Sequence, residues 1–238
     1  MGVDSGSRSA RTDPGTVVVT GGASGLGAAV AQAVAEAGGT PVVLDLGEPP
    51  FPADHQRVDL ADGRAAEAAV SAAAERHGGL DAVVTAAGVD RCGQLAEVPA
   101  KDWERVIQVN LLGTAAVVRA AWPFLERSGG RVVTVASTLG LRALPDATAY
   151  CASKFGVVGF TRALAAEAAG KVGVTMLVPG GMRTAFFDDR PEQYRPPADA
   201  NLNRPDDVAS AVLFALGQPP GCELRELVIC PSTEPSWP

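Results

Sequence analysis

The stretch TVVVTGGASGLG, residues 16–27, decides the fold of this chain. The β-branched run at 16–20 predicts a strand, and the Ala-rich sequence at 26–37 predicts a helix. The glycines between them allow positive φ angles and a close approach to the backbone. The free N–H groups and the dipole of the following helix favour an anion at this point. The turn is therefore either a phosphate-binding loop or simply a tight connection between strand and helix.

Short apolar strands alternate with helices along the rest of the chain. Because parallel strands need a helical crossover that covers the sheet, this alternation predicts an α/β fold. We expect one domain over 16–238: a Rossmann-type, doubly wound, mostly parallel seven-stranded sheet with helices on both faces. A flexible tail is expected at 1–15 and a substrate-side loop or lid at 185–204. The expected strands are 16–20, 41–46, a segment ending near 58, 82–85, 131–136, 174–178 and 227–230, and the expected helices are 26–37, 62 to the stop at 78–79, 100 to about 126, 147–169 and 206–216.

Composition excludes several classes of protein. The 238 residues are 47% hydrophobic and 20% charged, which excludes a wholly disordered chain. The net charge of −7 argues against a nucleic-acid or anionic-membrane surface, because phosphate binding draws on clustered Lys and Arg. An apolar run of about 18 residues, the length of a membrane span, is missing from the sequence.

The cysteines and histidines indicate a cytoplasmic protein without a metal site. The 4 cysteines are widely spaced and form no Cys-x-x-Cys pair, so we expect reduced thiols. With only 2 histidines, a His-rich metal site and a Ser-His-Asp triad are both hard to build. Metal-dependent hydrolysis is therefore not expected.

An acidic residue, Asp45, closes the second expected strand about twenty residues after the glycine-rich turn. A carboxylate at this place accepts hydrogen bonds from both adenosine ribose hydroxyls and repels a 2′-phosphate. The alternative is a solvated carboxylate at a strand end. The sequence places no Lys or Arg beside Asp45 or in the glycine-rich turn, so we expect NAD rather than NADP.

Tyr150 and Lys154 lie four residues apart on an expected helix and so project from the same face. Taken alone, such a pair is equally compatible with a surface contact. A phenol ordinarily titrates near pH 10, and a cation within about 4–6 Å lowers that pKa. Tyr150 would then serve as a general acid or base in an alcohol–carbonyl conversion, with Ser137 bonded to the same substrate oxygen.

These features together resemble the short-chain dehydrogenase/reductase family. The family's Thr-Gly-x-x-x-Gly-x-Gly pattern matches residues 20–27, and its Tyr-x-Ala-Ser-Lys motif matches 150–154. A Pro-Gly motif matches 179–180, and Thr184 stands at its expected place. The resemblance covers about 16–230. It implies a catalytic tetrad, whose members are Asn110, Ser137, Tyr150 and Lys154.

The resemblance also implies how a dinucleotide is bound. Asp59 and Leu60 would hold the adenine ring, and Asn110 would kink its helix and hold a water in a proton relay. Thr184 would bond the carboxamide of the nicotinamide. Thr85 departs from the family pattern, which has Asn there, so we expect changed local hydrogen bonding with activity retained. The residues implied in cofactor binding are Gly21, Ser24, Gly25, Leu26, Gly27, Asp45, Asp59, Leu60, Ala87, Gly88, Tyr150, Lys154, Pro179, Gly180, Met182 and Thr184.

Two functions fit the sequence. The first is an NAD(H)-dependent oxidoreductase that interconverts a secondary alcohol and a ketone, with Tyr150 as general acid/base. The alternative is a non-catalytic, dinucleotide-sensing binding protein on the same scaffold. The family resemblance further implies a homodimer or homotetramer. The expected pocket walls mix apolar side chains with arginines at 91, 142, 190 and 195, which is compatible with an apolar substrate that carries an anionic group.

Overall fold

The computed structural model of this chain describes residues 13–237. The first twelve residues of the expected tail lie outside the described residues. Within the described residues, the main-chain oxygen of Gly15 accepts a hydrogen bond from Thr40 N at 2.8 Å. The last residue of the expected tail is therefore bonded to the sheet.

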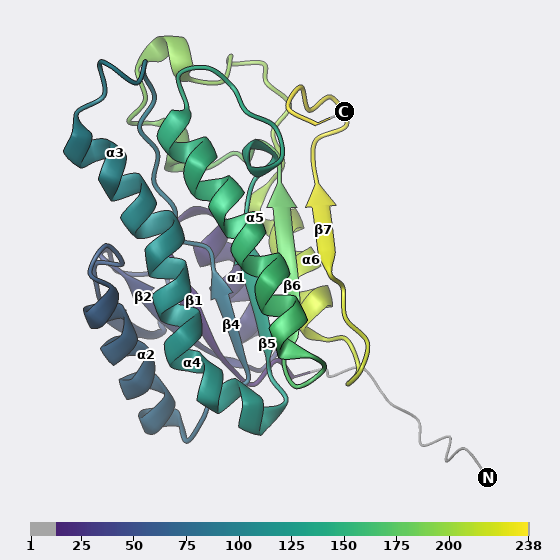
Figure 1. Cartoon of the computed structure of the whole chain (residues 1–238). Coiled ribbons are helices and arrows are strands. Elements are labelled where there is room, and N and C mark those ends of the chain that lie inside the picture. The colour runs from purple at the N-terminus through teal and green to yellow at the C-terminus, as the bar shows by residue number, and fades with distance from the viewer. Residues whose placement is uncertain (1–12, 238) are drawn as a thin grey trace.

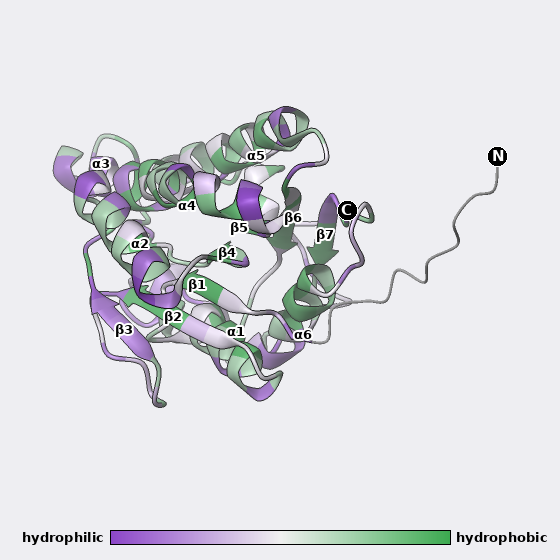
Figure 2. Cartoon of the chain, turned by 90° about the horizontal axis from the view of Figure 1, so that it is seen from below, coloured by the Kyte–Doolittle hydropathy of each residue, from purple (hydrophilic) through white to green (hydrophobic). Residues whose placement is uncertain are grey.

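Seven strands form one parallel sheet (Figure 1), ordered β3-β2-β1-β4-β5-β6-β7. Every pair of neighbouring strands is parallel, which confirms the predicted fold class. Strand β3 is short and hydrophilic, as suits an edge strand (Figure 2). The strands are β1 (Thr16–Thr20), β2 (Thr40–Asp45), β3 (Asp54–Arg57), β4 (Ala82–Thr85), β5 (Arg131–Val135), β6 (Gly173–Pro179) and β7 (Glu226–Ile229).

Helices cover both faces of the sheet (Figures 1 and 2). Successive strand residues point to opposite faces, so Val18 packs against α2 and α4, whereas Val17 and Val19 pack against α1 and α6. The buried strands therefore read as continuous valine runs. The helices are α1 (Gly25–Glu36), α2 (Gly63–His77), α3 (Ala100–Ile107), α4 (Thr114–Ser128), α5 (Thr148–Ala168) and α6 (Pro205–Leu216).

One expected helix, 100 to about 126, is broken in the structure. A π-helical turn, Gln108–Gly113, separates α3 from α4. Just after it, Thr114 Oγ1 donates back to the main-chain oxygen of Asn110 at 2.8 Å. Gly113 packs on Leu60, where an added Cβ would lie 2.7 Å from the Leu60 oxygen. The periodicity predicts the helix but not this local change in winding, whereas the family resemblance implied a kink at Asn110, which lies in the turn; such turns often mark a functional site.

The fold directs the strand ends toward one edge. All seven strands point the same way. The chain continues from β1 to β2 on one side and from β4 to β5 on the other, so the strand order reverses between β1 and β4. In open α/β sheets ligands bind at this switch point, beyond the carboxyl ends of the strands. In the described part of the chain, each helix is too short or too polar to cross a membrane.

Candidate active site

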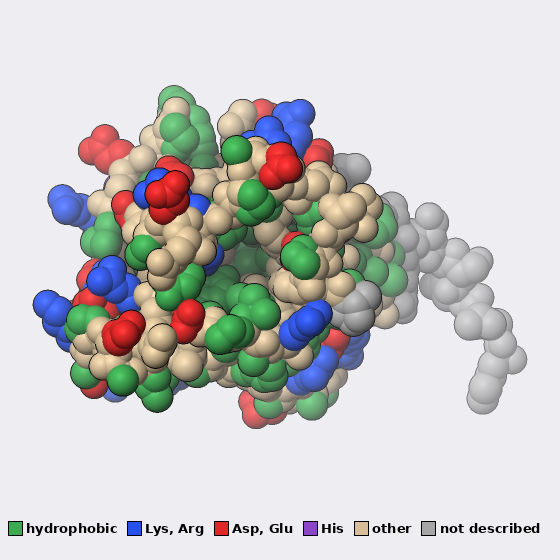
Figure 3. Space-filling model, turned by 90° about the horizontal axis from the view of Figure 1, so that it is seen from above, with side chains coloured by type: hydrophobic (Ala, Val, Ile, Leu, Met, Phe, Trp, Pro, Cys, Tyr) green, Lys and Arg blue, Asp and Glu red, His purple; other side chains and the backbone are tan. Residues whose placement is uncertain are grey.

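A cavity of about 800 Å³ opens at the carboxyl ends of the strands. Figure 3 looks down on this edge and shows a hollow with hydrophobic side chains at its floor. The cavity brings together all sixteen residues expected to bind a dinucleotide, from Gly21 in the first turn to Thr184 beyond β6. Residues more than a hundred positions apart in sequence thus share one wall.

The glycine-rich turn is shaped as its sequence indicates. Gly21 and Gly25 have φ angles of 71° and 53°, which glycine adopts without strain. A Cβ on Gly21 would lie 2.7 Å from Cα of Ala87, so no larger residue fits between β1 and β4. The Thr20 hydroxyl also accepts a bond from Ala87 N at 3.1 Å. The turn therefore presents bare backbone to the cavity at the N-terminus of α1.

Asp45 lies at the end of β2 and lines the cavity. Its two carboxylate oxygens accept bonds from Ala23 N at 3.0 Å and Gly47 N at 2.9 Å. These bonds fix the carboxylate against the glycine-rich turn. Since a carboxylate offers about four acceptor positions, two remain for further donors.

Asp59 forms an ion pair that the sequence analysis missed. Ala61 N donates to its carboxylate at 3.0 Å, and Arg105 approaches it at 3.1 Å. The bond from Ala61, together with the guanidinium, holds the pKa of Asp59 below its usual value. Arg105 also lines the cavity, 46 residues further along the chain than Asp59. No local sequence signal links the two.

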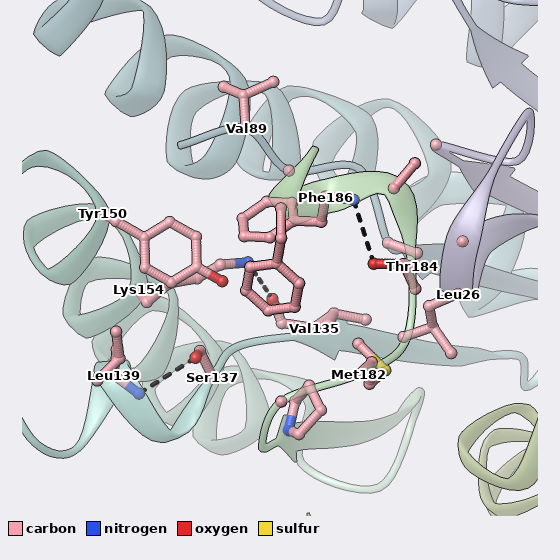
Figure 4. Close-up of a pocket in the computed structure, with 18 of the residues that line it drawn as sticks. Leu26, Val89, Val135, Ser137, Leu139, Tyr150, Lys154, Met182, Thr184 and Phe186 are labelled. Atoms are coloured by element: carbon pink, nitrogen blue, oxygen red, sulfur yellow. Dashed lines mark hydrogen bonds between the residues drawn. The ribbon is translucent and has the colours of Figure 1, made fainter. Parts of the chain in front are cut away.

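Tyr150 and Lys154 lie on one side of the cavity, both from α5, as Figure 4 shows. The Lys154 ammonium lies 5.6 Å from the centroid of the Tyr150 ring. It is 4% exposed and donates to the main-chain oxygen of Val135 at 2.8 Å. The pair is thus one turn apart on one helix face, as its spacing predicts.

The electrostatics of this pair correct the sequence-based expectation. Burial raises the pKa of Tyr150 to about 12, and the hydrogen bond with Ser137 only partly opposes this. Burial also lowers the pKa of Lys154 to about 8. The expected lowering of the Tyr150 pKa by Lys154 is therefore wrong for the free protein, because both side chains lose water and each shifts toward its neutral form.

Ser137 follows β5 and is 8% exposed. Its hydroxyl accepts a bond from Leu139 N at 3.1 Å, which caps the short 3₁₀ turn Thr138–Gly140. The Oγ faces the Tyr150 side of the cavity (Figure 4). The Ser137 hydroxyl thus caps this turn and also faces the cavity.

Asn110 lies behind the cavity wall rather than on its surface. Its side chain is 1% exposed. It accepts from Val89 N at 2.8 Å and donates to Val89 O at 2.9 Å and to Ser153 Oγ at 3.0 Å. A Cβ on Gly88 would lie 3.6 Å from its Oδ1 and 3.7 Å from Lys154 Nζ. Asn110 therefore fastens the loop after β4 to α5.

Thr85, which stands where the family pattern has Asn, is buried at the end of β4. The side chain is 2% exposed. Its Oγ1 has no hydrogen-bond partner among the described residues. The hydroxyl is thus buried without compensation at the end of β4.

The segment after β6 lines the cavity beside Tyr150. Phe186 lies 5.7 Å from Tyr150 and 5.5 Å from Phe187, measured between ring centroids. Thr184 accepts a bond from Phe186 N at 3.3 Å and shapes the turn that carries both rings. Arg190 also lines the cavity and pairs with Asp90 at 2.6 Å, a contact that sequence reasoning missed.

The C-terminal segment forms a further wall that no sequence signal indicated. Residues 233–236 line the cavity. Glu234 accepts from Gly181 N at 2.8 Å, and the Ser236 and Thr138 hydroxyls are bonded at 2.7 Å. The resemblance had ended near 230, so these contacts lay outside it.

The cavity fits an extended dinucleotide and offers no metal site. A bare glycine turn at a helix N-terminus, the Asp45 carboxylate and the Asp59–Leu60 wall lie along one continuous space that reaches Tyr150. Among residues 13–237 no group of three or more His, Cys, Asp or Glu side chains is placed to hold a metal ion.

Comparison with known proteins identifies relatives over most of the chain. The family model of the short chain dehydrogenases matches residues 15–195. D-threitol dehydrogenase of Mycolicibacterium smegmatis is 34% identical over 224 residues, 86% of each chain. Glycine betaine reductase ATRR of Emericella nidulans is 33% identical over 92% of this chain, which spans only 19% of that larger protein.

A solved structure extends the likeness to three dimensions. A short chain dehydrogenase of Burkholderia cenocepacia in complex with NADP superposes with a TM-score of 0.80 at 27% identity. The match covers 92% of this chain and 98% of the other.

Proposed function

The chain belongs to the short-chain dehydrogenase family of oxidoreductases, and from this premise we propose that it interconverts a secondary alcohol and a ketone with NAD(H), using Tyr150 as general acid and base. One observation carries the proposal: Tyr150, Ser137 and Lys154 share the wall of the cavity that also holds the glycine-rich turn. A binding protein has no chemical need for this group of side chains.

Each side chain has a stated task in the proposal. NAD(H), when bound, supplies the hydride acceptor or donor. Ser137 donates to the substrate oxygen and orients it, and Tyr150 takes or returns the proton on that oxygen. Lys154 holds a positive charge one helical turn from the phenol. Because the pKa of Tyr150 is about 12 in the free protein, the phenol becomes a useful base only when added positive charge beside it favours the phenolate.

Asn110 is a positioning residue in this scheme. It reaches neither the cavity surface nor Tyr150, but its amide fixes the loop at Val89 and the α5 residue Ser153. Ser153 in turn donates to the main-chain oxygen of Tyr150 at 2.8 Å. Asn110 therefore acts on the reaction through the placement of α5 and of the loop that faces the cofactor.

The preference for NAD over NADP rests on Asp45. Its carboxylate lies at the end of β2 with two acceptor positions left, and Arg105, which lines the same cavity, is paired with Asp59. A 2′-phosphate beside Asp45 would meet a like charge, and the cation nearest to Asp45 in the sheet is its register partner on β3, Arg57. The Burkholderia relative, by its description, binds NADP, so the choice needs a direct test.

The test is turnover followed at the absorbance of the reduced cofactor, with NAD⁺ and NADP⁺ in parallel. A panel of secondary alcohols and the matching ketones is supplied in both directions. We expect turnover that is faster with NAD(H) at equal concentration. Tight binding of NADH without turnover of any alcohol or ketone would instead support the dinucleotide-sensing alternative.

We also propose assembly into a homodimer or homotetramer and a cytoplasmic location. Two large apolar side chains near the π-helical turn, Leu112 and Phe155, are 56% and 45% exposed, which suits burial against a second copy. All four cysteines are unpaired, in keeping with a reducing compartment.

A further inference from the structure

We propose that Asp90 masks the charge of Arg190 and so makes this protein select an uncharged, largely apolar alcohol or ketone over an anionic one. This inference rests on the proposed function and names its substrate class. It assigns Asp90 as a specificity-determining residue, although Asp90 itself does not line the cavity.

The ion pair between these residues is close and largely buried. Nη2 of Arg190 lies 2.6 Å from Oδ2 of Asp90, and the two side chains are 18% and 4% exposed. Arg91 N and the Cys92 thiol also donate to the Asp90 carboxylate, at 2.6 and 3.2 Å. The carboxylate is thus anchored in the loop after β4, and Arg190 reaches it from the segment after β6, with its Nε buried and without a hydrogen-bond partner among the described residues.

The pair lies close to the reacting group. The Arg190 guanidinium lies over the rings of Phe186 and Phe187, 5.1 and 4.6 Å from their centroids, and Phe186 in turn neighbours Tyr150. Asp90 raises the pKa of Tyr150 and Arg190 lowers it. The opposite charges therefore both act at the phenol and offset one another there.

The other arginines expected near the substrate are also engaged. Arg142 donates to the main-chain oxygen of Pro235 at 3.1 Å, and Arg91 lies 3.5 Å from the Asp102 carboxylate. Arg195 donates to the main-chain oxygens of Arg190 and Asp188. None of these three arginines is among the residues that line the cavity, so the anionic group that the sequence allowed is not favoured.

The rest of the wall on the substrate side mixes apolar side chains with hydroxyl and amide side chains, among them Thr138, Asn201 and Ser236. Its two remaining charged members are the Glu234 carboxylate, bonded to Gly181 N, and the Lys154 ammonium beside Tyr150. An anionic substrate would add negative charge near Asp90 and Glu234, and like charges repel. The apolar side chains of this wall are Val89, Leu139, Leu144, Met182, Phe186 and Phe187.

A matched pair of substrates tests the inference. 1-Phenylethanol and 4-(1-hydroxyethyl)benzoate share the same carbinol and differ by a distant carboxylate. We expect kcat/KM with NAD⁺ to be at least about tenfold higher for the neutral compound, the effect of a modest charge repulsion. Asp90→Asn leaves Arg190 uncompensated, so the ratio should fall at least about tenfold and approach or pass unity.

Three further variants and a second readout sharpen the result. The double variant Asp90→Asn/Arg190→Gln restores a neutral pair and should restore the preference for the neutral alcohol. The control Asp199→Asn removes an exposed carboxylate from the same segment and should leave the ratio unchanged. Arg190→Lys keeps the charge and should behave as the wild type. Calorimetric binding of acetophenone and 4-acetylbenzoate to the NADH-loaded protein should show the same order of affinities.

The outcomes separate this inference from the proposed function. A wild-type preference for the carboxylate compound, a ratio unmoved by Asp90→Asn, or failure to bind either ketone would overturn the inference. Binding of the neutral ketone without turnover of any alcohol or ketone would overturn the proposed function and leave the charge preference standing.

Discussion

The Lys154 ammonium lies over the Tyr150 ring, 5.6 Å from its centroid, yet donates its hydrogen bond to the main-chain oxygen of Val135. Burial lowers the pKa of Lys154 to about 8 and raises that of Tyr150 to about 12. The free protein therefore holds both groups in surroundings that favour their neutral forms. Folding stability favours the neutral forms of these two side chains, whereas the proposed reaction needs the phenolate and the ammonium.

Removal of the phenolic hydroxyl should stop turnover and spare cofactor binding. In Tyr150→Phe the ring remains but the proton on the substrate oxygen has no acceptor, so kcat should fall about 10²–10⁴-fold. The dissociation constant of NADH, measured by its fluorescence, should change little. Tyr194→Phe is the matched control, because that hydroxyl only bonds Asp146 at 3.2 Å. Equal losses in the two variants would contradict the assignment.

Replacement of the buried lysine should stabilise the protein while it abolishes turnover. A pKa shift from 10.5 to about 8 corresponds to about 3 kcal/mol at neutral pH. Lys154→Met removes this cost. It also leaves Val135 O without its donor, which destabilises the folded protein by about 1 kcal/mol. We expect a net gain of about 2 kcal/mol in the free energy of unfolding at pH 7, measured by denaturant titration.

The pH dependence of that gain gives a check on its cause. Between pH 8 and 10.5 the unfolded chain still holds the Lys154 proton while the native protein has lost it, so wild-type stability rises with pH in this window. The advantage of Lys154→Met should therefore shrink over this range and reverse near its upper end, where only the lost bond to Val135 O remains. An advantage constant with pH would exclude the buried charge as its cause.

Asp45 should decide between the two dinucleotides. Asp45→Asn keeps the shape of the side chain and removes the charge that repels a 2′-phosphate. The ratio of kcat/KM for NAD⁺ to that for NADP⁺ should fall by at least about tenfold. Glu48→Gln neutralises an exposed carboxylate nearby and should not move the ratio. An unchanged ratio in Asp45→Asn would remove the basis for NAD preference.

The sequence predicts the parts of this molecule that depend on neighbours in the chain. The glycine-rich turn, the strand of Asp45 and the spacing of Tyr150 to Lys154 follow from local periodicity and turn chemistry. The pairing of Asp90 with Arg190 joins residues 100 positions apart. Such contacts depend on how loops meet over the sheet, which no local pattern records. The raised pKa of Tyr150 could likewise not be predicted from the sequence, because burial rather than residue spacing sets it.

The unpartnered hydroxyl of Thr85 should cost stability. Thr85→Val keeps the shape and removes a buried polar group without a partner, so the free energy of unfolding should rise by about 1 kcal/mol. Thr134→Val on the adjacent strand is the control. Its Oγ1 shares a 2.7 Å bond with Thr161 Oγ1, so the same change there should destabilise the protein. Equal effects of the two substitutions would show that Thr85 has a partner after all.

The exposed side chains of Leu112 and Phe155 should mark a contact between copies of the chain. They lie on the π-helical turn and on α5, which pack together where Leu111 meets Gly156. A charge buried in such a contact is strongly unfavourable, so Leu112→Asp or Phe155→Glu should shift the protein toward monomer. Light scattering coupled to size-exclusion chromatography measures the shift. Leu95→Asp alters a side chain that is 65% exposed in another loop and should leave the mass unchanged. A wild-type protein that elutes as a monomer would refute the assembly.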